Sequence, residues 1–255
     1  MPGVLEYKNI VMGVTGSIAC YKALDLVSKL TQGHAMVDVI MSDGATHFIT
    51  PLAFRSLTHR PVVTNMFDIS SELSIEHVAL AEKADIVVVA PATANCIAKI
   101  AHGLADDALT TTVLATQAPL LIAPAMDAHM YANPATQENL AKLVSRGTTI
   151  VGPTEGRLAS GLVGMGRLSE TCDIVGHICA TLENQGDLAG CTVVVTAGGT
   201  QEPIDPVRVV TNRSSGKMGY AVAEAARDRG SKVILITSSA LQAPAGVEVH
   251  RANTA

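Results

Sequence analysis

The sequence predicts a doubly wound α/β domain on a parallel sheet, followed by the start of a second, smaller α/β domain. Short β-branched and aliphatic runs alternate with segments whose apolar residues recur at helical spacing. These runs are continuous, which is typical of parallel strands covered on both faces. After a glycine-rich segment and a polar segment, 184–187, the same alternation begins again.

The first domain contains five predicted strands and five predicted helices, one of which is the VALAEKA segment after His77. The clearest strands are DIVVVA and APLLIA, because almost every residue in them is apolar. In the first helix Leu24, Val27 and Leu30 lie three residues apart, on one helical face. The predicted strands are 8–14, 35–41, 85–90, 118–123 and 149–151, and the predicted helices are 18–30, 95–103, 135–146 and 171–182.

The second domain begins after the polar, turn-forming NQGD segment at 184–187. We therefore expect domains at 1–187 and 188–255. The second contains predicted strands at 191–197, 232–237 and 247–250 and a helix at 217–229. It has 68 residues, which is short for a nucleotide-binding domain, so we expect it to be truncated.

Composition excludes several classes of protein. The net charge is −5, aromatic residues make up 3% of the chain and there is no Trp, so we expect no nucleic-acid partner. No apolar run is long enough for a membrane span, and Glu6 and Lys8 argue against a signal peptide. The five cysteines are scattered without a C-x-x-C pair, which indicates neither a disulfide framework nor a metal site. We expect a cytoplasmic protein.

Polar residues and glycines follow three of the predicted strands. Gly16 and Ser17 follow the first strand and open a helix, as in anion sites at helix N-termini, although a plain strand–helix turn is equally consistent. The absence of G-x-G-x-x-G favours a mononucleotide or a single phosphate over a dinucleotide. Thr93 and Asn95 follow a later strand, where open sheets bind ligands, and helix capping is the alternative. Asp127 follows another strand, and its position is consistent with a helix N-cap as well as with a catalytic site.

Two further features stand outside these loops. His77 precedes the apolar helix VALAEKA, where a lone histidine is more often a surface or capping residue than a catalyst. The segment 152–167 contains five glycines in sixteen residues. A loop of that length in a compact domain is usually functional or disordered.

Together these segments resemble a known family. The motifs are TGSIAxYK, HVxLAxxAD, APATANxIAKxAxGxADD, PAMDxxMY and GRLASGxxGxGR. They are similar to those of the FMN-dependent cysteine decarboxylases. VVVTAGGTQEPIDPVR and TNRSSGKMG resemble the ligase half of the bifunctional phosphopantothenoylcysteine decarboxylase/phosphopantothenate–cysteine ligases of coenzyme A biosynthesis. The resemblance covers essentially the whole chain and implies a Rossmann- or flavodoxin-like flavoprotein domain.

The resemblance implies FMN as cofactor and 4′-phosphopantothenoylcysteine as the small-molecule substrate. It implies a homo-oligomer, a trimer or dodecamer, and no metal in the decarboxylase. His77 would serve as a base or orienting group, and Asp127, Arg157, Leu158 and Ala159 would bind substrate. The implied FMN-binding residues are Gly16, Ser17, Ile18, Ser42, Thr93, Ala94, Asn95, Cys96 and Ala125.

A flavin suits this chemistry because loss of CO₂ from a cysteine carboxylate leaves a carbanion without an electron sink. Oxidation of the thiol-bearing carbon to a thioaldehyde provides that sink. The enethiol left after CO₂ loss is then reduced, so that the cycle has no net redox change. The cofactor carries these steps while the protein positions the substrate and excludes water.

This chain departs from the family at two positions. Asp127 stands where the family commonly has Asn, and an ionised Asp cannot donate a hydrogen bond to a substrate carboxylate. Asp127 is therefore either protonated, with a raised pKa, or it orients another group. Ser160 stands where the family usually has the Cys that protonates the enethiol. Ser160 either relays a proton from water, or another acid serves, or turnover stalls after decarboxylation.

In the second domain, the resemblance assigns Asn212 to the cysteine-attack half of a ligase reaction that uses CTP and Mg²⁺. The catalytic lysine segment of the family is missing from this chain, so we expect no ligase activity from it. The residues that resemble nucleotide-binding loops are Gly198, Gly199, Ser214, Ser215 and Gly216.

Three alternatives stay open. A peptide-cysteine decarboxylase of the same flavoprotein group is disfavoured by the ligase motifs, because a ligase supplies phosphopantothenoylcysteine. A flavin prenyltransferase fits the PAMD and GRLAS segments less well. A non-catalytic FMN-binding regulatory subunit is consistent with Ser160 but not with His77 and the full glycine-rich segment.

Overall fold

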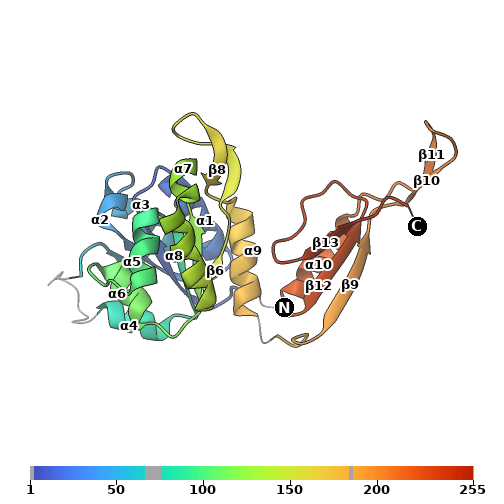
Figure 1. The fold of residues 1–255 in the computed structure, drawn as a ribbon. Helices are drawn as coiled ribbons and strands as arrows, with labels where there is room; N and C mark the ends of the chain where they lie inside the picture. Colours follow the sequence, from blue (N-terminus) through green and yellow to red (C-terminus); the bar gives the residue numbers. More distant parts are fainter. Residues whose placement is uncertain (1–2, 67–75, 184–185, 255) are drawn as a thin grey trace. The chain divides into compact units, whose positions relative to one another are not determined.

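The computed structural model describes residues 3–66, 76–183 and 186–254. The chain divides into two compact units, Met1–Ile178 and Cys179–Ala255 (Figure 1). The expected boundary after Asp187 stays a prediction, and residues 184–185 of the polar segment lie outside the described residues.

The first unit is built on a parallel sheet of six strands in the order β3-β2-β1-β4-β5-β6. This order confirms the predicted doubly wound sheet, because successive strands are added on one side of β1 up to β3 and on its other side from β4 onward. In such sheets ligands bind outside the carboxyl ends of the strands at that point. The strands are β1 (Asn9–Val14), β2 (Met36–Met41), β3 (Val62–Val63), β4 (Ile86–Ala92), β5 (Leu120–Pro124) and β6 (Thr149–Ile150).

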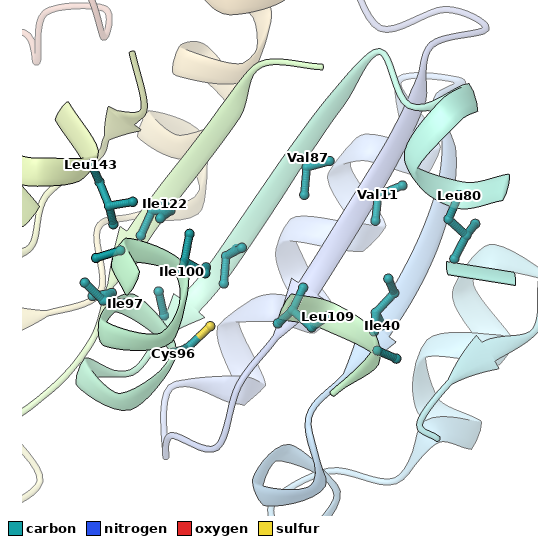
Figure 2. Packing of buried hydrophobic residues seen from close by; sticks show 14 of the residues in the cluster. Val11, Ile40, Leu80, Val87, Cys96, Ile97, Ile100, Leu109, Ile122 and Leu143 are labelled. Carbon is teal, nitrogen blue, oxygen red and sulfur yellow. The ribbon is translucent and has the colours of Figure 1, made fainter. Parts of the chain in front are cut away.

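Helices cover the sheet, and their apolar faces form the core together with the strands. Figure 2 shows one side of it, where Val11, Val87 and Ile122 of the strands meet helical residues such as Ile97 and Leu109. The helices are α1 (Cys20–Gln32), α2 (Asp43–Thr46), α3 (Pro51–Thr58), α4 (Glu76–Lys83), α5 (Ala94–His102), α6 (Ala108–Ala115), α7 (Ala128–Ala132), α8 (Pro134–Ser145) and α9 (Thr171–Leu182).

Several short elements were not predicted from the sequence: α2, α3, α6, α7 and β3. Helix α6 is the clearest case, because its threonines have weak helix propensity and obscure the helical pattern. A capping box starts this helix: Asp107 accepts a hydrogen bond from the Thr110 backbone N–H, and the Thr110 hydroxyl interacts with the Asp107 backbone N–H.

The glycine-rich segment is not an irregular loop but an antiparallel hairpin, β7 (Thr154–Arg157) and β8 (Val163–Arg167), which we call the flap. Gly166 anchors its base, since the Gly166 carbonyl accepts a 3.0 Å hydrogen bond from the Met126 N–H. A Cβ at position 166 would lie 2.2 Å from the Met126 carbonyl oxygen. Glycine is therefore required there for close packing.

The second unit contains three parallel strands in the order β13-β12-β9, with α10 packed against them. Its hairpin β10–β11 was not predicted from the sequence. No helix among the residues described is long and apolar enough to span a membrane. The elements are β9 (Thr192–Ala197), β10 (Gln201–Pro203), β11 (Val209–Thr211), α10 (Lys217–Arg227), β12 (Lys232–Thr237) and β13 (Glu248–Arg251).

Candidate active site

The loops that follow β1 and β4 are joined by one buried hydroxyl. Thr15 Oγ donates a 2.7 Å hydrogen bond to the Pro91 carbonyl and accepts a 2.9 Å bond from the Thr93 N–H. The loop after β5 joins the same group, because the Ala125 N–H donates to the Ala92 carbonyl at 3.0 Å. The three loops singled out from the sequence therefore lie together at one edge of the sheet.

Gly16 lets the first of these loops approach the segment after β2. A Cβ on Gly16 would lie 2.7 Å from the Gly44 carbonyl carbon and 2.9 Å from its Cα. Real Cβ atoms essentially never come that close to backbone. Only glycine fits at position 16 with the loops in this arrangement.

Two adjoining cavities open at this edge, and both are lined by Gly16, Thr93, Ala94 and Met130. The larger, of about 600 Å³, lies between the strand-end loops and the flap. Its lining includes the predicted residues Gly16, Ser17, Ile18, Thr93, Ala94, Ala125, Asp127, Arg157, Leu158, Ala159 and Ser160. The smaller, of about 480 Å³, is lined by the predicted Ser42, Asn95 and Cys96 in addition to Gly16, Thr93 and Ala94.

The cavities fit a flavin mononucleotide by size and by lining. The larger cavity is mostly apolar, with a few polar side chains such as those of Ser17 and Thr93 in its lining. Thr93 caps helix α5 by accepting a hydrogen bond from the Cys96 N–H. Burial raises the pKa of the Cys96 thiol to about 12, so this cysteine remains a neutral packing group.

The flap contacts the loop after β5 through its tip. Ser160 Oγ donates a 2.7 Å hydrogen bond to Asp127 Oδ2, and the His129 N–H donates to Asp127 Oδ1 at 3.0 Å. Asp127 is thus the N-cap of α7 and also the partner of the flap. Asp127 and Ser160, the two positions at which the sequence departs from the motifs it resembles, therefore meet in this one contact.

The hydrogen bond from Ser160, followed by that from the His129 N–H, holds the pKa of Asp127 below its ordinary value. The first alternative for Asp127, a protonated carboxyl whose pKa is raised beside the substrate anion, stays a prediction for the substrate-bound protein. In the structure this side chain is partly exposed and accepts two hydrogen bonds. It fits the second alternative, an ionised carboxylate that orients the flap.

A pH prediction follows from this direction. A carboxyl whose pKa is lowered in the folded state stabilises the fold at pH values above its unfolded-state pKa. This stabilisation is lost as the pH falls through the folded-state pKa. The Asp127–Ser160 bond is therefore expected to persist between about pH 5 and 8. Asp127→Asn should change the height of the kcat/KM pH profile in that range without moving any inflection. An inflection lost in the variant would contradict this.

Several lining residues were missed by the sequence reasoning. Lys22 lies on the first turn of α1 and lines the larger cavity, where its Nζ lies 3.2 Å from the Leu168 carbonyl and 3.0 Å from Glu170 Oε1. The others in the two linings are Thr15, Ala19, Tyr21, Asp43, Gly44, Lys99, Asp107, Leu109, Met126, Met130, Gly166, Arg167 and Leu168.

His77 cannot be placed in the site. Its backbone lies in the first turn of α4, and its side chain is outside the part of the chain that the structure describes. Its catalytic role stays a prediction. Among the described residues, no group of three or more His, Cys, Asp or Glu side chains could hold a metal ion.

The predicted ligase residues meet within the second unit. Asn212 Oδ1 accepts a hydrogen bond from the Ser214 N–H. It also lies close to Gly199, since a Cβ added to Gly199 would be 2.2 Å from this oxygen. Gly198 and Gly216 also face each other across 3.3 Å, measured from an added Gly216 Cβ to the Gly198 nitrogen. Ser215 accepts a bond at its carbonyl from Ser239 Oγ. Their nucleotide-binding role stays a prediction.

Two family models match the chain. The flavoprotein family matches residues 2–183, and the DNA/pantothenate metabolism flavoprotein C-terminal domain matches residues 188–255. The chain belongs to the flavoprotein family. The first match covers the whole unit that carries both cavities.

Curated relatives of this flavoprotein are bifunctional proteins of coenzyme A biosynthesis. The coenzyme A biosynthesis bifunctional protein CoaBC of Bacillus subtilis is 48% identical over 249 residues, which cover 96% of this chain and 61% of the relative. The CoaBC protein of Mycobacterium bovis is 45% identical over 254 residues, covering 97% of this chain and 60% of the relative. The chain thus spans about three fifths of the length of these relatives.

Solved structures support the same fold. The FMN-dependent cysteine decarboxylase SpaF is 34% identical with a TM-score of 0.60, covering 70% of this chain and 97% of that one. A Cys-to-Ser mutant of a PPC decarboxylase, complexed with pantothenoylaminoethenethiol, is 30% identical with a TM-score of 0.61. That comparison covers 68% of this flavoprotein and 97% of the other chain.

Proposed function

We propose that the first unit catalyses the FMN-dependent decarboxylation of 4′-phosphopantothenoylcysteine to 4′-phosphopantetheine. The observation that carries this proposal is the larger cavity, which is bounded on one side by the strand-end loops and on the other by the flap. A flavin held at the loops would face a substrate held under the flap. The likeness to CoaBC proteins and to a PPC decarboxylase supports this choice of substrate.

The residues of the chain would bind, orient and exclude water. Gly16, Thr93 and Ala94 line both cavities and would hold the cofactor where the cavities meet. Bound FMN would supply the electron sink for loss of CO₂ and return the electrons afterwards. Leu158 on the flap would cover the substrate, while the Asp127–Ser160 bond holds the flap tip in place.

Further parts of the proposal concern the longer protein. By its likeness to CoaBC, the second unit would belong to a CTP- and Mg²⁺-dependent phosphopantothenate–cysteine ligase, with Asn212 in the cysteine-attack step and Gly198, Gly199, Ser214, Ser215 and Gly216 near the nucleotide. We also propose a homo-oligomer, a trimer or dodecamer, working in the cytoplasm. Domains at 1–187 and 188–255 complete this proposal.

An anaerobic single-turnover experiment tests the function. The purified flavoprotein is mixed with 4′-phosphopantothenoylcysteine while flavin absorbance is followed and products are weighed by mass spectrometry. Transient bleaching with 4′-phosphopantetheine formed is the expected result. Lasting bleaching with an enethiol product would restrict the activity to oxidative decarboxylation. Neither bleaching nor CO₂ release would overturn the proposal in favour of a regulatory flavoprotein.

A further inference from the structure

The larger cavity contains a charge imbalance that the proposed function leaves unexplained. Asp127 presents an ionised carboxylate, although the proposed substrate brings a carboxylate and a phosphate of its own. Like charges repel strongly at the short distances and reduced dielectric of a binding site. An anionic substrate therefore needs a positive group at this place.

Four cationic side chains line the two cavities, and three of them are already paired. Lys22 and Arg167 both bond to Glu170, at 3.0 and 2.9 Å. Lys99 in the smaller cavity bonds to Asp106 at 2.7 Å and to Asp107 at 3.3 Å. The fourth, Arg157, forms no hydrogen bond or ion pair with any residue that the structure describes.

Arg157 and Asp127 line the same cavity, one from the flap and the other from the loop after β5. Arg157 ends β7 and immediately precedes a tight turn, in which the Gly161 N–H donates to the Leu158 carbonyl at 2.9 Å. Ser160, within that turn, bonds to Asp127. The flap residue that bonds to Asp127 is therefore three residues from Arg157 along the chain.

This cavity adjoins the smaller one. Met130, one helical turn beyond Asp127, lines both cavities. The carboxylate of the substrate is two bonds from the thiol-bearing carbon that must face the cofactor, whereas the phosphate is at the far end of the molecule. A positive group in the cavity that Asp127 lines is thus available to the carboxylate.

We propose that Arg157 binds the carboxylate of the cysteinyl substrate and offsets its repulsion by Asp127, so that it is a specificity-determining residue. This inference rests on the proposed function. A guanidinium can pair with a carboxylate through two parallel N–H···O bonds and stays charged at every working pH. An asparagine at position 127 could donate to the carboxylate itself, but the aspartate of this chain cannot.

The test measures binding without turnover. The FMN-loaded protein is titrated with 4′-phosphopantothenoyl-alanine, which lacks the thiol, and with its alaninamide counterpart, which also lacks the carboxylate. Binding is followed by calorimetry and by the change in flavin absorbance. The wild type should bind the carboxylate form about 10-fold more tightly, in line with a charge-assisted bond in a partly exposed site.

In Arg157→Gln this preference should disappear, while affinity for the amide stays within about twofold. Arg157→Lys should retain part of the preference for the carboxylate, because lysine keeps the positive charge but cannot form the two parallel N–H···O bonds of a guanidinium. Arg55→Gln is the matched control, since Arg55 is an exposed arginine on α3 that lines neither cavity. With the natural substrate, Arg157→Gln should raise KM about 10-fold and change kcat less.

A preference for the carboxylate that survives in Arg157→Gln would overturn the proposal, as would a wild type without such a preference. Equal loss of affinity for both analogues would assign Arg157 to the phosphate instead and also overturn it. The outcome is separate from that of the proposed function. The analogues cannot be oxidised, so a carboxylate preference can be present in a protein that releases no CO₂.

Discussion

Gly16→Ala is expected to yield a folded protein that has lost most of its flavin. The added Cβ would lie within 3 Å of three Gly44 backbone atoms, so one of the two loops must move. A displacement of that kind in a binding site can cost about 100-fold. The flavin-to-protein absorbance ratio of the purified protein measures the effect, and calorimetric titration of the apoprotein with FMN gives the change in Kd.

Gly33→Ala provides the matched control. Its Cβ would be crowded as well, but by the Leu5 side chain, with the nearest atom at 2.7 Å, and neither Gly33 nor Leu5 lines either of the two cavities. We expect this variant to melt at a lower temperature and to retain FMN. Equal flavin content in Gly16→Ala and the wild type would show that the approach of Gly16 to Gly44 is not needed for cofactor binding.

Ser160→Cys is expected to accelerate the formation of 4′-phosphopantetheine from the enethiol by about 100-fold, the scale of a general-acid contribution. In the wild type the Ser160 proton is directed at the Asp127 carboxylate, and an alcohol is a far weaker acid than a thiol. A relay through Ser160 is therefore slow. Rapid-quench single turnovers with mass spectrometry of the product give the rate.

Ser160→Ala separates the roles of the hydroxyl. If Ser160 supplies no proton, the alanine variant should convert the enethiol at the wild-type rate while its flap tip is less well held. If the wild type converts the enethiol as fast as Ser160→Cys and much faster than Ser160→Ala, the interpretation that Ser160 supplies no proton is wrong. Ser160 would then be established as a proton relay. Either result leaves the decarboxylation step itself intact.

Sequence reasoning predicted the sheet well because its signals are local and strong. DIVVVA and APLLIA are strands β4 and β5 within two residues at each end, since a long apolar run has no other stable place than a covered sheet. Helix α1 begins at Cys20 rather than at residue 18, because Ser17 to Ala19 form a turn in which the Cys20 N–H bonds to the Ser17 carbonyl. Such a shift has no signature in hydrophobic periodicity.

The loops of the site could be predicted from the sequence, but the contacts between residues far apart in the sequence could not. Gly16, Thr93 and Asp127 could be found because polar or glycine residues after buried strands mark the ligand edge of an open sheet. The pairing of Ser160 with Asp127, 33 residues apart, depends on how the flap folds back. Nor could the sequence tell that the Lys22 side chain is paired while that of Arg157 has no partner among the described residues, because both are isolated cations in the chain.

The flap is attached very differently at its two ends. Its base is fixed by backbone, through the bond between Met126 and the Gly166 carbonyl, whereas its tip is held to Asp127 by one side-chain hydrogen bond at a partly exposed position. The tip is therefore the more weakly attached end, and it can separate from Asp127 without any change in the sheet or its core. We expect entry of substrate and release of product to depend on this single bond between Ser160 and Asp127, the two positions where the sequence departs from the motifs it resembles.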